Sequence, residues 1–349
     1  MRVVVVGATG NVGTSVLRAL ESEPAVDSVL GVARRLPRAR FTKTEWAAAD
    51  ISRDELVSLF RGAACVVHLA WLIQPSHDLP HVWRTNVLGS RRLIDAVVRA
   101  GVPSLVYASS VGTYAAGPKD RGVDESWPVD GISSSYYARH KAAVERELDR
   151  LEREHPGVRV VRLRPAFIFK REAGSGVRRL FAGPFLPSPL VRPAFIRFVP
   201  EHPRFRFQAV HSYDVADAYR RAIVGDARGA FNVAAEPVLD GPRLGELLHA
   251  RTVRVEHRVA RAFLQATWRL RLQPADGSWA DLAYGTPLLD TTRARTELGW
   301  GPTYTAEQAL LDLLGGIRDS ATFETPPLER KSRLEELATR VGGAEELSQ

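Results

Sequence analysis

A glycine-rich loop directly after the first apolar run of the chain constrains its fold more than any other feature. Residues 2–6 have the β-branched composition of a buried strand, and residues 7–13 follow as Gly-Ala-Thr-Gly-Asn-Val-Gly. Glycines between a strand and a helix let the backbone come close to a pyrophosphate, whose charge the free amides of the helix N-terminus bind. The loop therefore predicts a dinucleotide site at the first strand-to-helix turn.

The first half of the chain alternates short β-branched runs with helical patterns, which is typical of a parallel sheet covered by helices. The helical pattern at residues 85–100 places Val87, Ile94 and Val98 on one face, and Gly101 is positioned to end it. We expect strands at residues 2–6, 28–33, 45–49, 65–69, 104–108 and 159–163. The expected fold class is α/β, with a doubly wound parallel sheet and a smaller C-terminal substrate-binding lobe.

The amino-acid composition changes after residue 165, and this change indicates how the chain is divided into domains. Residues 166–206 are rich in Pro, Gly, Phe and Arg, which argues against regular sheet and favours a segment that wraps over the carboxyl ends of the strands. A strand, a helix and a strand within residues 207–233 then indicate a return to the first domain. We predict a dinucleotide-binding domain at 1–165 with 207–233 returning to it, a substrate-binding lobe at 166–206 and 234–318, and a polar tail at 319–349, loosely helical or disordered.

Charge and cysteine content limit the partners and the compartment. The 349 residues carry a net charge of +8, supplied mostly by arginines that are scattered along the chain. They concentrate only at residues 251–271, where the pattern is that of a basic amphipathic helix. We interpret it as a lobe helix with one face packed and one in water; the alternative is a surface for a membrane or a polyanion, with salt-sensitive association.

The only cysteine, Cys65, falls in an apolar run and has no partner for a disulfide, which fits a reducing compartment. No apolar stretch approaches the roughly 20 residues that cross a bilayer, and the first strand begins too early to leave room for a secretion signal. We therefore expect a cytoplasmic protein whose partner is a small-molecule substrate, with no nucleic acid, no stable membrane association and no metal.

A tyrosine and a lysine four residues apart provide the candidate chemistry. Tyr137 and Lys141 would lie on one face of a helix, where the cation can lower the pKa of the phenol and make it a proton shuttle. Ser109 and Ser110 end the fifth strand at the same edge of the sheet, where a hydroxyl can bind a substrate oxygen. Together with a dinucleotide, these groups predict hydride transfer.

The end of the second strand indicates which dinucleotide is bound. Arg34 and Arg35 stand where an acidic residue would bind a ribose 2′-hydroxyl, and cations there suit a 2′-phosphate, so NADP is expected, with NAD as second choice. Asp50, after the third strand, either accepts a hydrogen bond from the adenine or caps a helix that begins near Arg53. His68 is interpreted as an ordinary buried strand residue rather than a catalyst.

These motifs resemble the extended short-chain dehydrogenase/reductase family, the NAD(P)-dependent epimerase/dehydratase group, over nearly the whole chain, to about residue 317. The resemblance rests on the glycine loop, Tyr137-x-x-x-Lys141, Ser110 with Tyr114 following, Arg164-Pro165 and later landmarks around His211 and Trp300. It implies a Rossmann fold and catalysis by Ser110, Tyr137 and Lys141. The cofactor-binding residues that it implies, together with the loop and strand-end arguments above, are Gly7, Thr9, Gly10, Asn11, Val12, Gly13, Arg34, Arg35, Asp50, Ile51, Leu69, Ala70, Asn86, Tyr137, Lys141, Arg164 and Pro165.

Two departures from the family pattern narrow the expected function. Dehydratases of the family carry an Asp-Glu pair after the catalytic hydroxyl residue, whereas this chain has Val111 and Gly112 and so lacks an acid for a leaving hydroxyl. Nucleotide-sugar epimerases carry a pyrophosphate-binding arginine where this chain has Phe207, although Arg178, Arg179 or Arg192 could substitute.

We expect an oxidoreductase that interconverts a secondary alcohol and a ketone. A sugar or nucleotide-sugar epimerase and an NADPH-dependent carbonyl reductase acting on a non-sugar molecule both use that step. The alternative from another class is a regulator that senses NADP without turnover, against which the intact Ser110, Tyr137 and Lys141 argue. A homodimer formed through the helices that hold Asn86 and Tyr137 is an expectation from the family alone.

Overall fold

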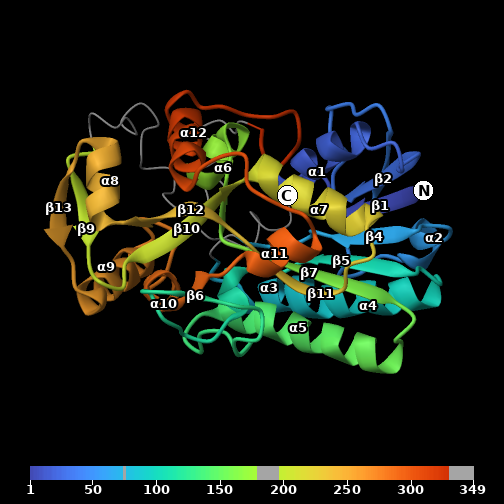
Figure 1. Ribbon diagram of the computed structural model, residues 1–349, viewed down its shortest axis with the longest axis horizontal. Helices are drawn as coiled ribbons and strands as arrows, with labels where there is room; N and C mark the ends of the chain where they lie inside the picture. Colours follow the sequence, from blue (N-terminus) through green and yellow to red (C-terminus); the bar gives the residue numbers. More distant parts are fainter. Residues whose placement is uncertain (74–75, 179–195, 330–349) are drawn as a thin grey trace.

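A parallel sheet forms the centre of the molecule in the computed structural model, which describes residues 1–73, 76–178 and 196–329 (Figure 1). Within these residues the sheet has seven strands in the order β11-β7-β5-β4-β1-β2-β3, all paired in parallel. The strands are β1 (Arg2–Val6), β2 (Ser28–Ala33), β3 (Thr44–Ala48), β4 (Cys65–His68), β5 (Ser104–Ala108), β7 (Arg159–Pro165) and β11 (Gly229–Val233). The order reverses between β1 and β4, which is where open sheets of this kind bind their ligands.

Helices cover both faces of this sheet, so the predicted doubly wound architecture is confirmed (Figure 1). One face carries α1 (Asn11–Glu21) and α7 (Ser212–Val224), whose apolar sides pack around Leu17 and Tyr219. The other face carries α2 (Val57–Phe60), α4 (Gly89–Arg99) and α5 (Tyr136–Glu154), which enclose a core that includes Leu93 and Leu148. Apolar residues at helical spacing thus bury both faces of the central strands, of which β1 and β4 are almost wholly apolar.

The strands end within two residues of the predicted positions, but the helix expected at residues 85–100 is divided. Its segments are α3 (Leu79–Trp83), a π-helical turn η1 (Arg84–Leu88) and α4, and Gly101 follows with a φ of 69°. A π-turn adds a residue to one turn of helix and is frequent at functional sites.

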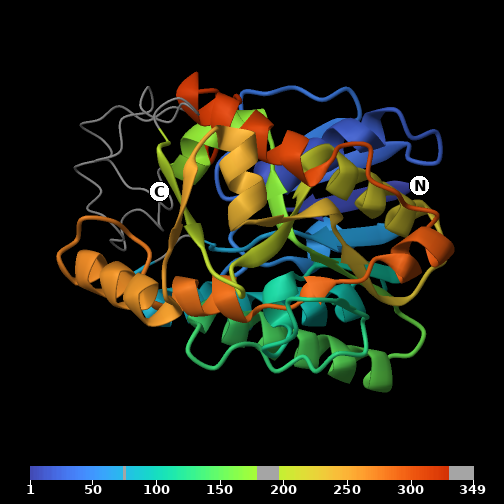
Figure 2. The same cartoon turned by 60° about the vertical axis from the view of Figure 1, so that its left-hand side comes forward.

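A second lobe contains two small sheets (Figures 1 and 2). One has the order β12-β10-β8 and the other pairs β13 with β9. The strands are β8 (Phe167–Phe169), β9 (Phe198–Glu201), β10 (Arg206–His211), β12 (Ala235–Asp240) and β13 (Arg251–Arg254). The helices are α6 (Gly174–Val177), α8 (Gly241–Leu248), α9 (His257–Arg269), α10 (Ser278–Gly285) and α12 (Ala306–Arg318), while β6 (Gly122–Val123), β14 (Leu288–Leu289), α11 (Thr292–Glu297), η2 (Val111–Thr113) and η3 (Arg171–Ala173) lie in the connections.

Three expectations need correction. The strand predicted to begin the return to the first domain is β10, which belongs to the lobe, so the chain rejoins the large sheet only with α7 and β11. Residues 166–206 were expected to exclude regular sheet but contain β8 and β9; the Pro-Gly cluster behind that expectation lies at 183–189, outside the described residues. The basic segment 251–271 begins as strand β13 before α9 starts.

The tail is ordered in its described part. The amide groups of Arg38 and Ala39 donate to the carbonyl of Glu324 at 3.2 and 3.0 Å, and Thr325 and Leu328 are buried. Residues 330–349 lie outside the described residues. In the part of the chain that the structure covers, no helix is long and apolar enough to cross a membrane.

Candidate active site

The glycine loop turns sharply between β1 and α1, and its glycines are required by close contacts. Gly7 has a φ of 87°, and a β-carbon there would lie 2.6 Å from the amide nitrogen of Ala70. A β-carbon on Gly13 would lie 2.5 Å from the carbonyl oxygen of Gly7. Gly10 precedes α1 and offers no side chain to cap it, so the amides of the first helical turn remain for a ligand. These features fit a dinucleotide pyrophosphate.

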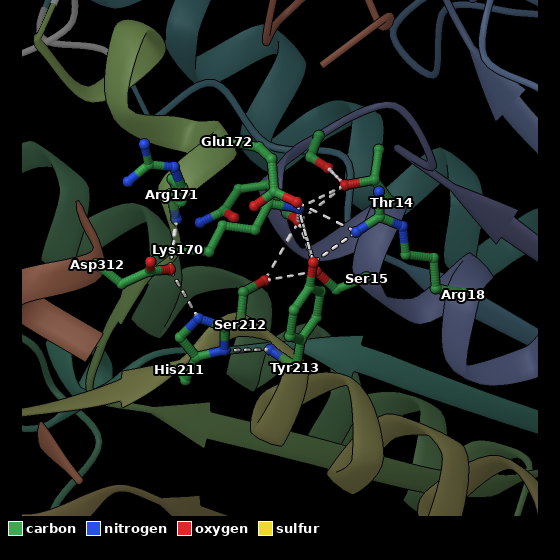
Figure 3. A network of polar contacts seen from close by, with 12 residues as sticks. Thr14, Ser15, Arg18, Lys170, Arg171, Glu172, His211, Ser212, Tyr213 and Asp312 are labelled. Carbon is green, nitrogen blue, oxygen red and sulfur yellow. Dashed lines mark hydrogen bonds and ion pairs between the residues drawn. The ribbon is translucent and has the colours of Figure 1, made fainter. Parts of the chain in front are cut away.

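A buried lysine fixes the first turn of α1 to the lobe (Figure 3). The Lys170 Nζ donates to the Asn11 carbonyl at 2.8 Å, to the Thr14 Oγ1 at 2.7 Å and to the Ser15 Oγ at 3.1 Å. Burial lowers the pKa of Lys170 to about 8. The Ser15 hydroxyl is 2.9 Å from that of Ser212, at the start of α7. This network holds the helix that carries the glycine loop.

Further polar contacts surround this lysine (Figure 3). Arg18 on α1 pairs with Glu172 at 3.1 Å, and the Tyr213 hydroxyl donates to the same carboxylate at 3.0 Å. His211 lies 3.2 Å from a carboxylate oxygen of Asp312 on α12. Sequence reasoning missed this network because it joins segments that are distant along the chain.

The groups expected at the adenine end lie beyond β2 and β3. Arg34 and Arg35 are exposed, while Ile51 is buried against Gly89. Burial acts to raise the pKa of Asp50, but hydrogen bonds from Ser52 and the charge of Arg34 outweigh it and lower that pKa. The alternative that Asp50 caps a helix near residue 53 is wrong, because α2 begins at Val57.

Ser110 and Tyr137, both predicted to be catalytic, lie side by side against Gly112. The Ser110 Oγ accepts from the Gly112 amide at 3.0 Å, and Ser110 is hydrogen-bonded to the Tyr137 hydroxyl. Burial raises the pKa of Tyr137 to about 12, and the bond to Ser110 opposes this rise. The Tyr137 ring lies 6.2 Å from the ring of Trp71, edge-on, and 5.7 Å from that of Trp279 on α10.

Lys141 lies beneath Trp71. Its Nζ donates to the Ala108 carbonyl at 2.6 Å and lies 3.6 Å from the centroid of the Trp71 ring. Burial lowers the pKa of Lys141 to about 7, against the charge of Glu145, which raises it. Among the neighbours of Tyr137, Ser110 is the one that acts to lower the pKa of its phenol. That Lys141 also lowers this pKa stays a prediction.

Arg164, expected to contact the cofactor, is engaged elsewhere. Its Nε and Nη2 donate to the two carboxylate oxygens of Glu145 at 3.0 Å each, and its Nη1 donates to the Tyr114 hydroxyl at 3.0 Å. Ser109 donates to the same carboxylate at 2.5 Å, which leaves Ser110 as the serine directed to Tyr137. Pro165 follows at the buried end of β7. Arg164 therefore stabilises the carboxyl end of β7 through its contacts with Glu145 and Tyr114.

Asn86 also acts through a neighbour. Its Oδ1 accepts from the Leu72 amide at 2.8 Å and its Nδ2 donates to the Leu72 carbonyl at 3.0 Å. This pair fixes the loop after β4, which includes the half-buried Leu69, Ala70 and Trp71. The expectation for His68 fits the structure, because its Nε2 is bonded to Ser90 at 2.8 Å and burial lowers its pKa to about 3.

Trp71 and Trp279 are not among the predicted site residues. Trp71 lies three residues after β4, in the loop whose Leu69 and Ala70 are predicted to bind the cofactor, and this position was a usable signal because ligands bind at the carboxyl ends of such strands. Trp279 lies on a lobe helix far along the chain from Tyr137, and no local pattern links the two.

Comparison with known proteins identifies the family of this chain. The model of the NAD dependent epimerase/dehydratase family matches residues 3–183. An uncharacterised protein of Mycobacterium tuberculosis is 26% identical over 339 residues, covering 90% of this chain and 83% of that protein. Sterol-4-alpha-carboxylate 3-dehydrogenase (decarboxylating) of Candida albicans is 32% identical over 147 residues, covering 41% of this chain and 40% of that protein.

Solved structures share the fold. The UDP-glucose 4-epimerase of Thermotoga maritima, crystallised with UDP-glucose, has a TM-score of 0.69 at 20% identity and covers 92% of this chain and 99% of its own. The matched family residues include the glycine loop, Ser110, Tyr137 and Lys141. The chain therefore belongs to the NAD-dependent epimerase/dehydratase family, within the extended short-chain dehydrogenases/reductases, and is an NAD(P)-dependent enzyme.

Proposed function

We propose that this enzyme interconverts a secondary alcohol and a ketone, with Tyr137 as the acid/base. The observation that carries the proposal is that the side chains of Ser110 and Tyr137 both lie against Gly112, at the carboxyl edge of the sheet that also holds the glycine loop. A bound nicotinamide supplies the hydride acceptor or donor, which no side chain can provide. The protein contributes binding, orientation and movement of the proton.

Each polar group then has one task. Ser110 binds the substrate oxygen, and Tyr137 removes or returns its proton. Burial alone makes the Tyr137 phenolate unfavourable, since it raises the pKa of that phenol to about 12. Lys141 would offset this cost in the cofactor complex by placing an ammonium group near the phenolate and the nicotinamide ribose.

The adenine end favours NADP over NAD in this proposal. Arg34 and Arg35 are exposed beyond the carboxyl end of β2, where a 2′-phosphate is bound in folds of this type. Arg34→Ser and Arg35→Ser should each weaken NADPH binding about tenfold while changing NADH binding little. Isothermal titration with both cofactors measures this, and an equal loss for NADH would remove the preference.

A substrate without a nucleotide is favoured by specific contacts. Phe207 occupies the position of the expected pyrophosphate-binding arginine, and its ring packs 5.5 Å from that of Phe167. The neighbouring Arg206 lies 3.9 Å from Asp240. Trp71 and Trp279 border Tyr137, so the described surroundings of the hydroxyl suit an apolar alcohol better than a sugar diphosphate. The runner-up is a sugar or nucleotide-sugar epimerase.

Two assays separate these reactions. The first measures oxidation of a 3β-hydroxysteroid with NADP by the absorbance of the NADPH formed. The second measures epimerisation of UDP-glucose with NAD by NMR. Tyr137→Phe should abolish whichever reaction is found and leave the cofactor Kd nearly unchanged. The adjacent Tyr136→Phe is the matched control and should keep most of the activity. Near-normal turnover by Tyr137→Phe would refute the assignment, and no turnover of a broad panel of alcohols would favour the NADP-sensing regulator.

A further inference from the structure

The apolar side of α9 faces outward. Val259, Phe263 and Leu270 follow one another at helical spacing and are 62%, 64% and 69% exposed, and Ala262 and Ala266 lie between them on the same face. Among the described residues, those of α9 are all at least partly exposed. A surface helix of a soluble domain normally turns such a stripe toward the core, so this orientation is the reverse of the usual one.

Polar contacts fix α9 in this orientation. His257 Nε2 lies 2.8 Å from Asp281 on α10, and the Nε of Arg261 donates to the same carboxylate at 3.1 Å. Near the other end, the Trp268 ring stacks on that of His77 at 4.2 Å. The inner side of α9 thus contacts α10 and the loop before α3, whereas Val259, Phe263 and Leu270 are exposed on its other side. Figure 2 shows α9, in orange, at the edge of the lobe.

Arginines border the stripe. Arg258 and Arg269 lie along one flank and Arg271 follows the helix, and all three are exposed. Within the described chain, no acidic side chain forms an ion pair with any of the three. The surface therefore combines exposed apolar side chains with uncompensated positive charge.

We propose that this outer face of α9 docks the protein reversibly on an anionic phospholipid surface. Val259, Phe263 and Leu270 would enter the boundary between headgroups and acyl chains, and the arginines would bind the lipid phosphates. A second copy of the chain fits less well, because pairing two such faces would bring like charges together. Nucleic acid fits less well too, because its phosphates give the apolar stripe no partner.

The docking face is adjacent to the candidate active site. It lies on the helix that packs against α10, and Trp279 of α10 contacts Tyr137. If the proposed reaction on an apolar alcohol is correct, docking would place the substrate lobe at the lipid surface in which such an alcohol dissolves. Docking itself depends only on α9 and is measured without turnover.

A single fluorophore tests insertion directly. Cys65 is buried, so Phe263→Cys gives one accessible thiol for an environment-sensitive dye, and Leu311→Cys on the exposed side of α12 is the matched control. With vesicles of equal phosphatidylglycerol and phosphatidylcholine at low salt, the dye at position 263 should brighten and shift to the blue. The dye at position 311 should not respond, and high salt should reverse the signal.

Variants of the unlabelled full chain separate charge from apolar contact. Arg258→Gln with Arg269→Gln and Arg271→Gln should weaken co-sedimentation with these vesicles at least about tenfold. The double variant Val259→Ser, Phe263→Ser should weaken co-sedimentation similarly. The control is the double variant Arg99→Gln, Arg153→Gln, at exposed ends of α4 and α5, which should co-sediment like the unmodified protein. Unchanged circular dichroism and NADPH binding would show that each variant is folded.

Three results would overturn the proposal: no co-sedimentation at low salt, equal co-sedimentation with pure phosphatidylcholine, or binding that the α9 variants do not reduce. A dimer in sedimentation equilibrium that Phe263→Ser dissolves would assign the face to self-association instead. Failure of docking would leave the reaction of Tyr137 untouched, and loss of turnover in Tyr137→Phe would leave docking untouched.

Discussion

Gly112 lies so close to the ring of Tyr137 that a β-carbon at position 112 would meet the Tyr137 Cε1 at 2.8 Å. A larger residue at position 112 would therefore displace the Tyr137 ring from its present position in this chain. Gly112 thus leaves the space that the Tyr137 ring occupies.

Gly112→Ala should impair turnover without unfolding the protein. The Tyr137 ring can swing away from a methyl group, but its hydroxyl then leaves Ser110, and a misplacement of about 1 Å costs on the order of 100-fold in rate. We expect kcat to fall by that order, with the cofactor Kd unchanged in fluorescence titration. Gly301→Ala, where the added methyl meets open space, is the control, and equal rates in the two variants would show that the contact has no role.

The two adjacent serines should separate catalysis from stability. Ser110→Ala removes the partner of the Tyr137 hydroxyl and should lower kcat about 100-fold with little change in the unfolding free energy. Ser109→Ala removes a hydrogen bond to the buried Glu145 carboxylate and should cost about 2 kcal/mol of stability with kcat nearly retained. Steady-state kinetics and urea denaturation of both variants decide this, and the opposite pattern would reverse the assignment.

Arg164→Met should destabilise the fold rather than weaken cofactor binding directly. It would remove the bidentate partner of the buried Glu145 carboxylate, which would keep Arg162 as its remaining cation, so the cost should be about 2–3 kcal/mol, below that of a buried charge left unpaired. Urea denaturation of the variant measures the loss. If its unfolding free energy were unchanged while the NADPH Kd rose, Arg164 would be a cofactor ligand after all.

Stability should rise with pH in the alkaline range. Burial lowers the pKa of Lys141 to about 7 and that of Lys170 to about 8, both from 10.5, so the unfolded chain binds more protons between about pH 7 and pH 10. The unfolding free energy should therefore increase across that window. Burial raises the pKa of Tyr137 and Tyr114 to about 12, so the stability should fall again above about pH 10, where the unfolded chain loses those protons first.

Lys170→Met measures the share of this rise that comes from Lys170. A shift of one pKa unit corresponds to about 1.4 kcal/mol, so the variant should lose on the order of 3 kcal/mol of the increase between neutral and alkaline pH. Urea denaturation at several pH values, with Lys43→Met as the partly exposed control, measures this difference. If the unfolding free energy of Lys170→Met rose with pH as steeply as that of the unmodified protein, burial of the Lys170 ammonium group would not be a source of the rise.

The large sheet was predictable because its signals are local. Most strands are β-branched runs of their own, the glycine loop defines the first turn, and parallel pairing follows from the intervening helices. The partners of a strand are not encoded in its own periodicity, which is why β10 was assigned to the wrong sheet. The π-turn at η1 was hidden for a similar reason, since it interrupts a pattern that is otherwise helical.

The reactive groups of the site were predictable, but their supports were not. Spacing alone pairs Tyr137 with Lys141, and strand order brings Ser110 to the same edge of the sheet. That Asn86 would hold Leu72, or that Trp279 would reach Tyr137 from the lobe, depends on contacts between distant segments. Such contacts arise from packing and leave no mark in the local sequence.

The chain leaves the large sheet at Pro165 and completes it only with α7 and β11, after part of the lobe has been built. A fragment that stopped at residue 165 would lack both elements, and the apolar side of α1 that packs against α7 would be bare. Neither region is a separable module. Exchanging the lobe for that of a relative would require three junctions, after Pro165, before Ser212 and after Val233, all of which have to preserve the framework they interrupt.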